Sequence, residues 1–205
     1  MSIVRLARLS SAFVLVVCAM LVPAGCGSSP KRAANTSQVP PSRGPEADAM
    51  IARADVLAAR GNSEGAASLY REALSIAPDR YIAWNNLGVE LMNLGNNIDA
   101  VAAFKVAADL SPRDPRPLAN VGLVYQNIGW AQDALEYYER SLQRDPAFLD
   151  ALRGWALAEE HLNYASLESL ERIKRATLME SDPQWREFFE RRRFRIQDQL
   201  NRSSE

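Results

Sequence analysis

From residue 47 onward, apolar residues recur at the three- and four-residue spacing of amphipathic helices, and landmark residues repeat every 34 positions. The landmarks with this period are Pro78, Pro112 and Pro146; Gly61, Gly95 and Gly129; Ala66, Ala100 and Ala134; and Tyr70, Phe104 and Tyr138. A glycine can end a helix in the left-handed conformation, and a proline prevents a second helix from continuing. Each period therefore predicts a helix, a turn and a second helix, and the fold class is all-α.

The second and third periods, residues 81–114 and 115–148, carry a fuller signature. The second period has Trp84, Leu87, Gly88, Leu91, Ala100, Phe104 and Ala107, and the third has Leu118, Val121, Gly122, Tyr125, Ala134, Tyr138 and Ser141. Both closely resemble the tetratricopeptide repeat (TPR), a helix-turn-helix unit. The resemblance implies an α-solenoid of stacked repeats, in which Gly88 and Gly122 let the paired helices approach and Phe104 and Tyr138 fill the space between units.

The remaining segments are expected to complete this TPR domain, residues 47–180. Residues 47–80 keep the second half of the signature, so their first helix is a degenerate cap. Residues 149–180 resemble a divergent fourth repeat, with Leu152, Trp155 and Ala156 in place but Asn163 instead of the turn glycine. Segment 181–205 is expected to hold a capping helix over 183–200, with one face formed by Trp185, Phe188, Phe189, Arg192 and Ile196. That aromatic face packs on the last repeat or, alternatively, drives self-association.

The first 25 residues have the pattern of an export signal. Arg5 and Arg8 precede a short apolar run, which ends in the sequence LVPAG before Cys26. This resembles the lipobox of bacterial lipoprotein precursors, which implies cleavage after residue 25 and a covalent lipid on Cys26. The alternatives are an ordinary secretory leader and an uncleaved anchor. Residues 26–46 contain four prolines and almost no large apolar residue, and predict a disordered tether.

The amino-acid composition excludes several classes of function. The chain of 205 residues has 24 basic and 25 acidic side chains and a net charge of −1, so no cationic surface for nucleic acid is expected. The only cysteines are Cys18 and Cys26, and His161 is the only histidine, which excludes the usual zinc clusters and a disulfide framework. Neither a nucleophile–base motif nor a phosphate-binding glycine loop is present. We therefore predict no enzyme activity, no metal and no cofactor apart from the lipid.

The TPR resemblance implies a concave groove lined by the first helix of each repeat. Helical phase places these residues there: Asn85, Asn86, Val89, Met92, Asn93, Arg116, Asn120, Leu123, Gln126, Asn127 and Arg153. Asn86 and Asn120 lie 34 residues apart and could hydrogen-bond the backbone of an extended peptide, because an amide both donates and accepts. Alternatively, these amides satisfy backbone groups in the turns.

Two further features bear on the partner. Chaperone-binding relatives hold an acidic peptide with basic groove residues, but this chain has Ile51, Asp55 and Val89 at those places. Arg116 and Arg153 could pair with an acidic side chain of a partner or form surface ion pairs of little energy.

The sequence thus predicts a non-enzymatic, lipid-anchored adaptor at the periplasmic face of the bacterial outer membrane. It would bind an extended segment of a periplasmic protein, for example in assembling a pilus or secretion complex. Two alternatives stay open: an adaptor for cell-wall enzymes or a protease, and a structural homo-oligomer formed through the C-terminal helix.

Overall fold

The computed structural model describes residues 44–203, which form nine α-helices and contain no β-strand. The helices are α1 (Gly44–Ala59), α2 (Ser63–Ile76), α3 (Tyr81–Asn93), α4 (Asn97–Leu110), α5 (Arg116–Asn127), α6 (Ala131–Arg144), α7 (Leu149–His161), α8 (Leu167–Met179) and α9 (Pro183–Ser203). The expected signal peptide and Cys26 lie outside the described residues. Within the described residues, no helix combines the length and apolar character needed to cross a bilayer.

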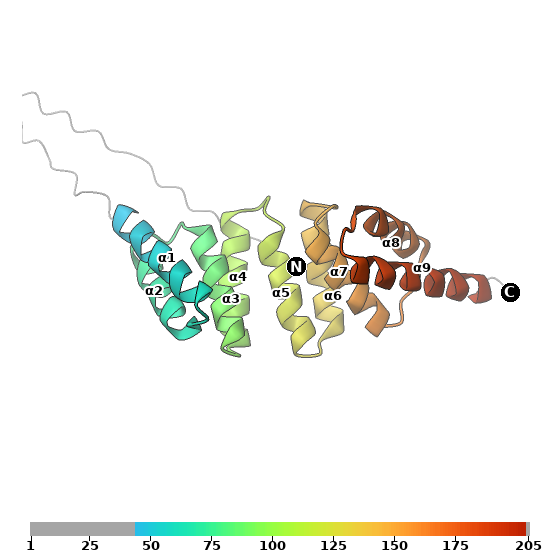
Figure 1. Cartoon of the computed structure of the whole chain (residues 1–205), viewed down its shortest axis with the longest axis horizontal. Coiled ribbons are helices and arrows are strands. Elements are labelled where there is room, and N and C mark those ends of the chain that lie inside the picture. The colour runs from blue at the N-terminus through green and yellow to red at the C-terminus, as the bar shows by residue number, and fades with distance from the viewer. Residues whose placement is uncertain (1–43, 204–205) are drawn as a thin grey trace, which may run out of the picture. The chain divides into compact units, whose positions relative to one another are not determined.

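Helices α1–α2, α3–α4 and α5–α6 pack as pairs, and the pairs follow one another in a row (Figure 1). The turn inside each pair contains a glycine in the left-handed conformation, with φ of 74° at Gly61, 77° at Gly95 and 82° at Gly129. Each pair therefore corresponds to one 34-residue period, and the prediction of an all-α solenoid is confirmed.

The first helices of neighbouring pairs lie closer together than the second helices. Helix α3 contacts α5, and α5 contacts α7, whereas α2, α4 and α6 make few such contacts with one another. The face formed by α1, α3, α5 and α7 is called the inner face below.

The helix glycines make room for an aromatic ring. A Cβ atom on Gly88 would lie 2.6 Å from the ring of Phe104, and one on Gly122 would lie 2.9 Å from the ring of Tyr138. Real Cβ atoms do not approach other atoms so closely, so only glycine fits here. The sequence analysis had assigned these glycines to the approach of two backbones, and the structure shows that the aromatic ring of the second helix needs the space.

In the C-terminal third, α8 packs more extensively on α9 than on α7, unlike the helix pairs of the first three repeats. Asn163 takes the place of the turn glycine with φ of 55°, a conformation that asparagine tolerates better than most residues. Helix α9 extends to Ser203, three residues beyond the expected end, and packs on α8 and α7. Phe189 and Ile196 are fully buried there, and Trp185 and Phe188 pack against the same core. Phe189 and Ile196 are therefore core residues, whereas Trp185 and Phe188 remain partly exposed.

Helix α1 begins at Gly44, so the last three residues of the expected tether are helical. Pro45 lies in the first turn, where its missing N–H has no helical partner to lose, and Glu46 carries a negative charge favourable at a helix start. The tether prediction was wrong for these three residues, because proline breaks a helix only beyond its first turn.

Candidate functional site

A row of hydrogen-bonded polar side chains crosses the inner face from α5 to α1. Asn120 on α5 donates to Oδ1 of Asn85 on α3 at 3.0 Å, and Asn85 donates to Oδ1 of Asn86 at 3.5 Å. Asn86 in turn donates to Oδ1 of Asp55 on α1 at 3.2 Å. Tyr70 of α2 also donates its hydroxyl to Asp55. These five residues, called the amide row below, tie three successive repeats together.

The side chains of the amide row bond chiefly to one another. Asn85, Asn86 and Asn120 are half-buried and face the groove side, as predicted, but their first partners are one another and Asp55. The alternative of bonds to turn backbone groups finds no counterpart among the hydrogen bonds of the described residues. The side-chain oxygen of Asn120, Oδ1, accepts no hydrogen bond from any described residue. The row therefore keeps polar capacity for a ligand.

Tyr70 is the buried end of this row, with 1% of its surface exposed. Burial, followed by the hydrogen bond to Asp55, raises the pKa of its hydroxyl far above the ordinary value. The hydroxyl is therefore protonated at all physiological pH values and is a permanent donor. Because the Tyr70 hydroxyl donates its hydrogen bond to Asp55, Tyr70 holds that carboxylate at the inner face.

Between α5 and α7, the inner face is hollowed. A cavity of about 310 Å³ is lined by Ala119, Asn120, Leu123, Gln126, Tyr138, Asp150, Arg153, Gly154, Leu157 and Trp185. Four of the predicted groove residues, Asn120, Leu123, Gln126 and Arg153, meet here. Oε1 of Gln126 accepts a hydrogen bond from the Tyr138 hydroxyl at 2.9 Å, which leaves its NH₂ group to donate.

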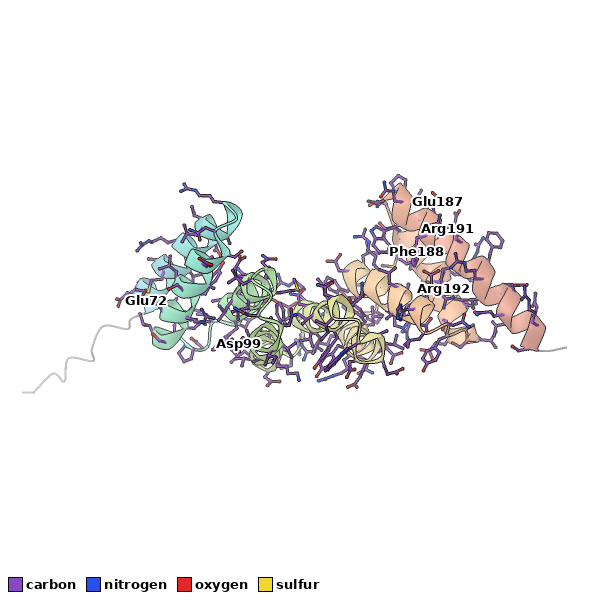
Figure 2. All side chains as sticks on the ribbon, turned by 90° about the horizontal axis from the view of Figure 1, so that it is seen from below. Glu72, Asp99, Glu187, Phe188, Arg191 and Arg192 are labelled. Atoms are coloured by element: carbon purple, nitrogen blue, oxygen red, sulfur yellow. The ribbon has the colours of Figure 1, made fainter. Side chains whose placement is uncertain are left out.

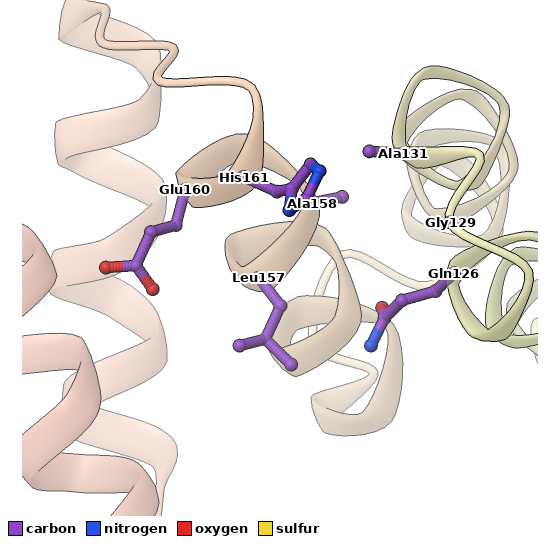
Figure 3. Close-up of a pocket in the computed structure, with 7 residues that line it drawn as sticks. All are labelled: Gln126, Gly129, Ala131, Leu157, Ala158, Glu160 and His161. Atoms are coloured by element: carbon purple, nitrogen blue, oxygen red, sulfur yellow. The ribbon is translucent and has the colours of Figure 1, made fainter.

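A second hollow adjoins the first and shares Gln126 and Leu157 with it. Its volume is about 330 Å³, and Figure 3 shows the side chains of Leu157 and Gln126 reaching toward each other from α7 and α5. His161, at the end of α7, also lines it. The two adjoining hollows, which we call the α5–α7 groove, combine apolar and amide side chains with the charged residues Asp150, Arg153 and Glu160.

The two predicted arginines already have acidic partners within the chain. Arg153 makes two hydrogen bonds of 2.8 Å to Glu180, whose side chain is completely buried, and its guanidinium lies 5.3 Å from the ring centre of Trp185. Arg116 pairs with Asp114 at 2.6 Å. The inner face consequently presents little uncompensated positive charge.

The other predicted residues lie at the edges of this surface. Val89 and Met92 are half-buried and pack against the core, and the Met92 sulfur accepts from Asn127 at 3.9 Å. Asn93 and Asn127 are the exposed last residues of α3 and α5. They contribute polar groups near the turns rather than in the α5–α7 groove.

Sequence reasoning missed three participants. Trp185 lines the groove although its helix was assigned only a capping role, Glu180 neutralises Arg153, and Tyr70 anchors Asp55. Trp185 and Tyr70 had been given core roles from their spacing, but Glu180 lies 27 residues from Arg153 and carries no local signal. In the described residues, no group of three or more histidine, cysteine or acidic side chains could hold a metal ion.

The chain resembles several characterised proteins over its repeats. It is 32% identical over 107 residues to the peroxisomal targeting signal receptor of Eremothecium gossypii, which covers 52% of this chain and 18% of that protein. It is 30% identical over 122 residues to the human protein O-mannosyl-transferase TMTC3, covering 58% and 13%. The chain thus spans less than a fifth of these relatives.

A solved structure shows the same fold. The first TPR of Spaghetti (RPAP3), bound to the HSP90 peptide SRMEEVD, superposes with a TM-score of 0.56 at 16% identity, covering 59% of this chain and 96% of that one. Family models described as tetratricopeptide repeats match residues 42–81, 51–115 and 115–148. These matches extend over more than half of the 205 residues, and the chain belongs to the tetratricopeptide-repeat family.

Proposed function

We propose that this protein is a non-enzymatic adaptor that holds an extended segment of a partner protein along the inner face. The observation that carries the proposal is the amide row, continued by the α5–α7 groove. An extended peptide needs donors and acceptors for its backbone and pockets for alternate side chains. The Asn120 carbonyl and the Gln126 NH₂ group can serve the backbone, and Leu123 and Leu157 can contact apolar side chains.

The partner segment should not be strongly acidic. Ile51, Asp55 and Val89 stand where chaperone-binding relatives carry basic residues, and Arg153 is already neutralised by Glu180. A carboxylate placed beside Asp55 would be repelled, because like charges without a counter-ion cost free energy in a half-buried site. The peptide SRMEEVD is therefore a useful negative probe for this chain.

The experiment is a crosslinking comparison in the native cell. A photoreactive residue at Leu123 should capture the partner. The double variant Asn86→Ala, Asn120→Ala should reduce capture by about tenfold, because it removes the Asn120 acceptor and breaks the row that orients it. The matched control is Asn96→Ala, since Asn96 is exposed before α4 and its side chain caps nothing. Circular dichroism establishes that all variants are folded. Equal capture by the double variant and the control would remove the inner face as the binding surface.

We further propose that the adaptor is tethered to the bacterial envelope through a lipid on Cys26. The support is the sequence pattern before that cysteine, and a roughly 20-residue linker would let the repeats reach away from the membrane. Cys26→Ser should abolish incorporation of radiolabelled palmitate in growing cells, whereas Cys18→Ser should keep it, because Cys18 lies within the expected leader. Labelling of the Cys26→Ser protein would contradict the anchor without affecting the binding proposal.

Within that envelope location, assembly of a pilus or secretion complex is the role we favour. An adaptor for cell-wall enzymes or a protease would use the same surface. The structural alternative, a homo-oligomer through α9, has less support because Trp185 and Phe188 pack against the core of their own chain.

A further inference from the structure

A second groove lies on the side of α3 that faces away from the inner face. It runs between α2 and α4 and has a volume of about 520 Å³. Its lining consists of Arg71, Leu74, Ser75, Trp84, Leu87, Leu91, Asp99, Ala102, Ala103 and Val106. We call it the outer groove. Figure 2 shows Asp99 on α4 and Glu72 on α2 along the same edge of the stack, away from the start of α9.

The equivalent place in the next repeat is filled by aromatic rings. Ala103 and Leu91 of the outer groove correspond, 34 residues on, to Tyr137 and Tyr125. Tyr137 is 9% exposed and stacks on Tyr125, with ring centres 5.4 Å apart. The ring of Tyr137 thus fills the gap between α4 and α6. The equivalent gap between α2 and α4 stays open, because Ala103 has no ring.

Cations flank the filling ring. The Lys105 ammonium lies 5.4 Å from the centre of the Tyr137 ring, and the Arg140 guanidinium lies 4.8 Å from it. The residue equivalent to Lys105 is Arg71, which lines the outer groove. In the described part of the chain, Arg71 makes no ion pair or hydrogen bond, so its charge is available to a ligand.

We propose that the outer groove receives an aromatic side chain of a partner protein, next to an acidic residue of that partner. The apolar floor and the analogy with Tyr137 select the ring. The unpaired Arg71 on α2 attracts a negative charge on its side of the groove, whereas Asp99 on α4 repels one on the other side. The chain's own residues outside the structure do not supply the ring: among 1–43 and 204–205 the only aromatic residue is Phe13, which lies in the expected leader. This binding mode is independent of the inner face.

The test uses capped dipeptides and NMR spectra of the full chain with labelled alanine methyl groups. Acetyl-Glu-Tyr-amide at millimolar concentration should shift the methyl signals of Ala102 and Ala103. Acetyl-Lys-Tyr-amide should bind about fivefold more weakly, the size of one exposed charge interaction. Acetyl-Glu-Ala-amide should cause no shift. Arg71→Ala should remove the preference for the glutamate dipeptide, because Asp99 is then the charged residue left in the lining.

A self-filling variant provides the decisive comparison. Ala103→Tyr places in the outer groove the residue found at position 137, and it should abolish the shift of Ala102. Ile98→Tyr is the matched control, because Ile98 is 87% exposed on the same helix and does not line the groove. If Ala103→Tyr does not fold, Val106→Glu, at a 36% exposed rim position, should block the acidic dipeptide instead.

Four results would overturn the proposal. The first two are no methyl shift with acetyl-Glu-Tyr-amide and unchanged binding by whichever of Ala103→Tyr and Val106→Glu folds. The others are equal binding of both tyrosine dipeptides to the unaltered chain, and methyl shifts that depend on protein concentration without any dipeptide. The last result would assign the groove to a second copy of the chain. Loss of binding to the inner face in Asn86→Ala, Asn120→Ala leaves these readings unchanged, so the two proposals can fail separately.

Discussion

Gly154 shows how tightly a single position can be constrained in this stack. A Cβ atom there would lie 2.1 to 2.5 Å from three atoms of the Tyr138 side chain. The Tyr138 ring is held in place, because it also lies against Gly122 and its hydroxyl donates to Gln126 at 2.9 Å. The ring of one repeat thus packs into glycine gaps on its own repeat and the next.

Gly154→Ala should therefore lower the free energy of unfolding by about 2 kcal/mol, as overpacking of a rigid core does. Gly65→Ala is the comparison variant, since a methyl group there meets the ends of two side chains, Leu57 and the Asn62 that caps α2, rather than an aromatic ring. We expect the control to change stability by less than about 1 kcal/mol, helped by the better helix propensity of alanine. Urea unfolding followed by circular dichroism measures both. Similar losses in both variants would refute the packing argument.

At the scale of elements, two buried glutamates join the last three helices and respond oppositely to acid. Glu180, after α8, accepts a hydrogen bond from the guanidinium of Arg153 on α7. This hydrogen bond lowers the pKa of Glu180 below the ordinary 4.5. Glu159 on α7 accepts from Ser169 on α8, but burial raises its pKa above 4.5. One of its oxygens is buried without a partner.

The signs follow from proton binding. Below pH 4.5 the unfolded state binds more protons at Glu180 than the folded state, so the stability from Glu180 is lost as the pH falls through its folded pKa. Above pH 4.5 the folded state binds more protons at Glu159, so its contribution declines as the pH rises through its raised pKa.

Glu180→Gln should cost about 2 kcal/mol near neutral pH, the value of hydrogen bonds to a charged group. The difference in unfolding free energy between Glu180→Gln and the unaltered chain should shrink below pH 4.5, where Glu180 becomes protonated. Glu159→Gln should cost less at neutral pH and change the pH profile only above 4.5. Denaturant titrations at several pH values test this pair. A constant difference for Glu180→Gln across the acid range would contradict the assigned ion pair.

The whole stack is held by contacts between neighbours. One buried cluster extends from Ala54 to Tyr137 and a second from Ala119 to Ile196, and the partly buried Tyr125 packs against both. Helix α9 closes the second cluster with Phe189 and Ile196 and exposes charged residues on its other side. A repeat array needs such an end, because its last unit would otherwise leave an apolar face in water.

Much of this architecture was predictable from local pattern. The turn glycines, the prolines after the second helices and the spacing of Phe104 and Tyr138 predicted the helix pairs and their order, because each acts within one or two turns of its own position. The inner-face location of Asn85, Asn86 and Asn120 followed from helical phase.

The sequence by itself thus determined the three regular helix pairs and which side chains share a face. Only the tertiary structure decided which partner each of them takes: Asn120 with Asn85, Arg153 with Glu180, and an open hollow at Ala103 where Tyr137 fills its counterpart. These choices depend on distances between residues about 30 positions apart, and such distances are set when neighbouring repeats pack. Periodicity within a helix carries no information about them.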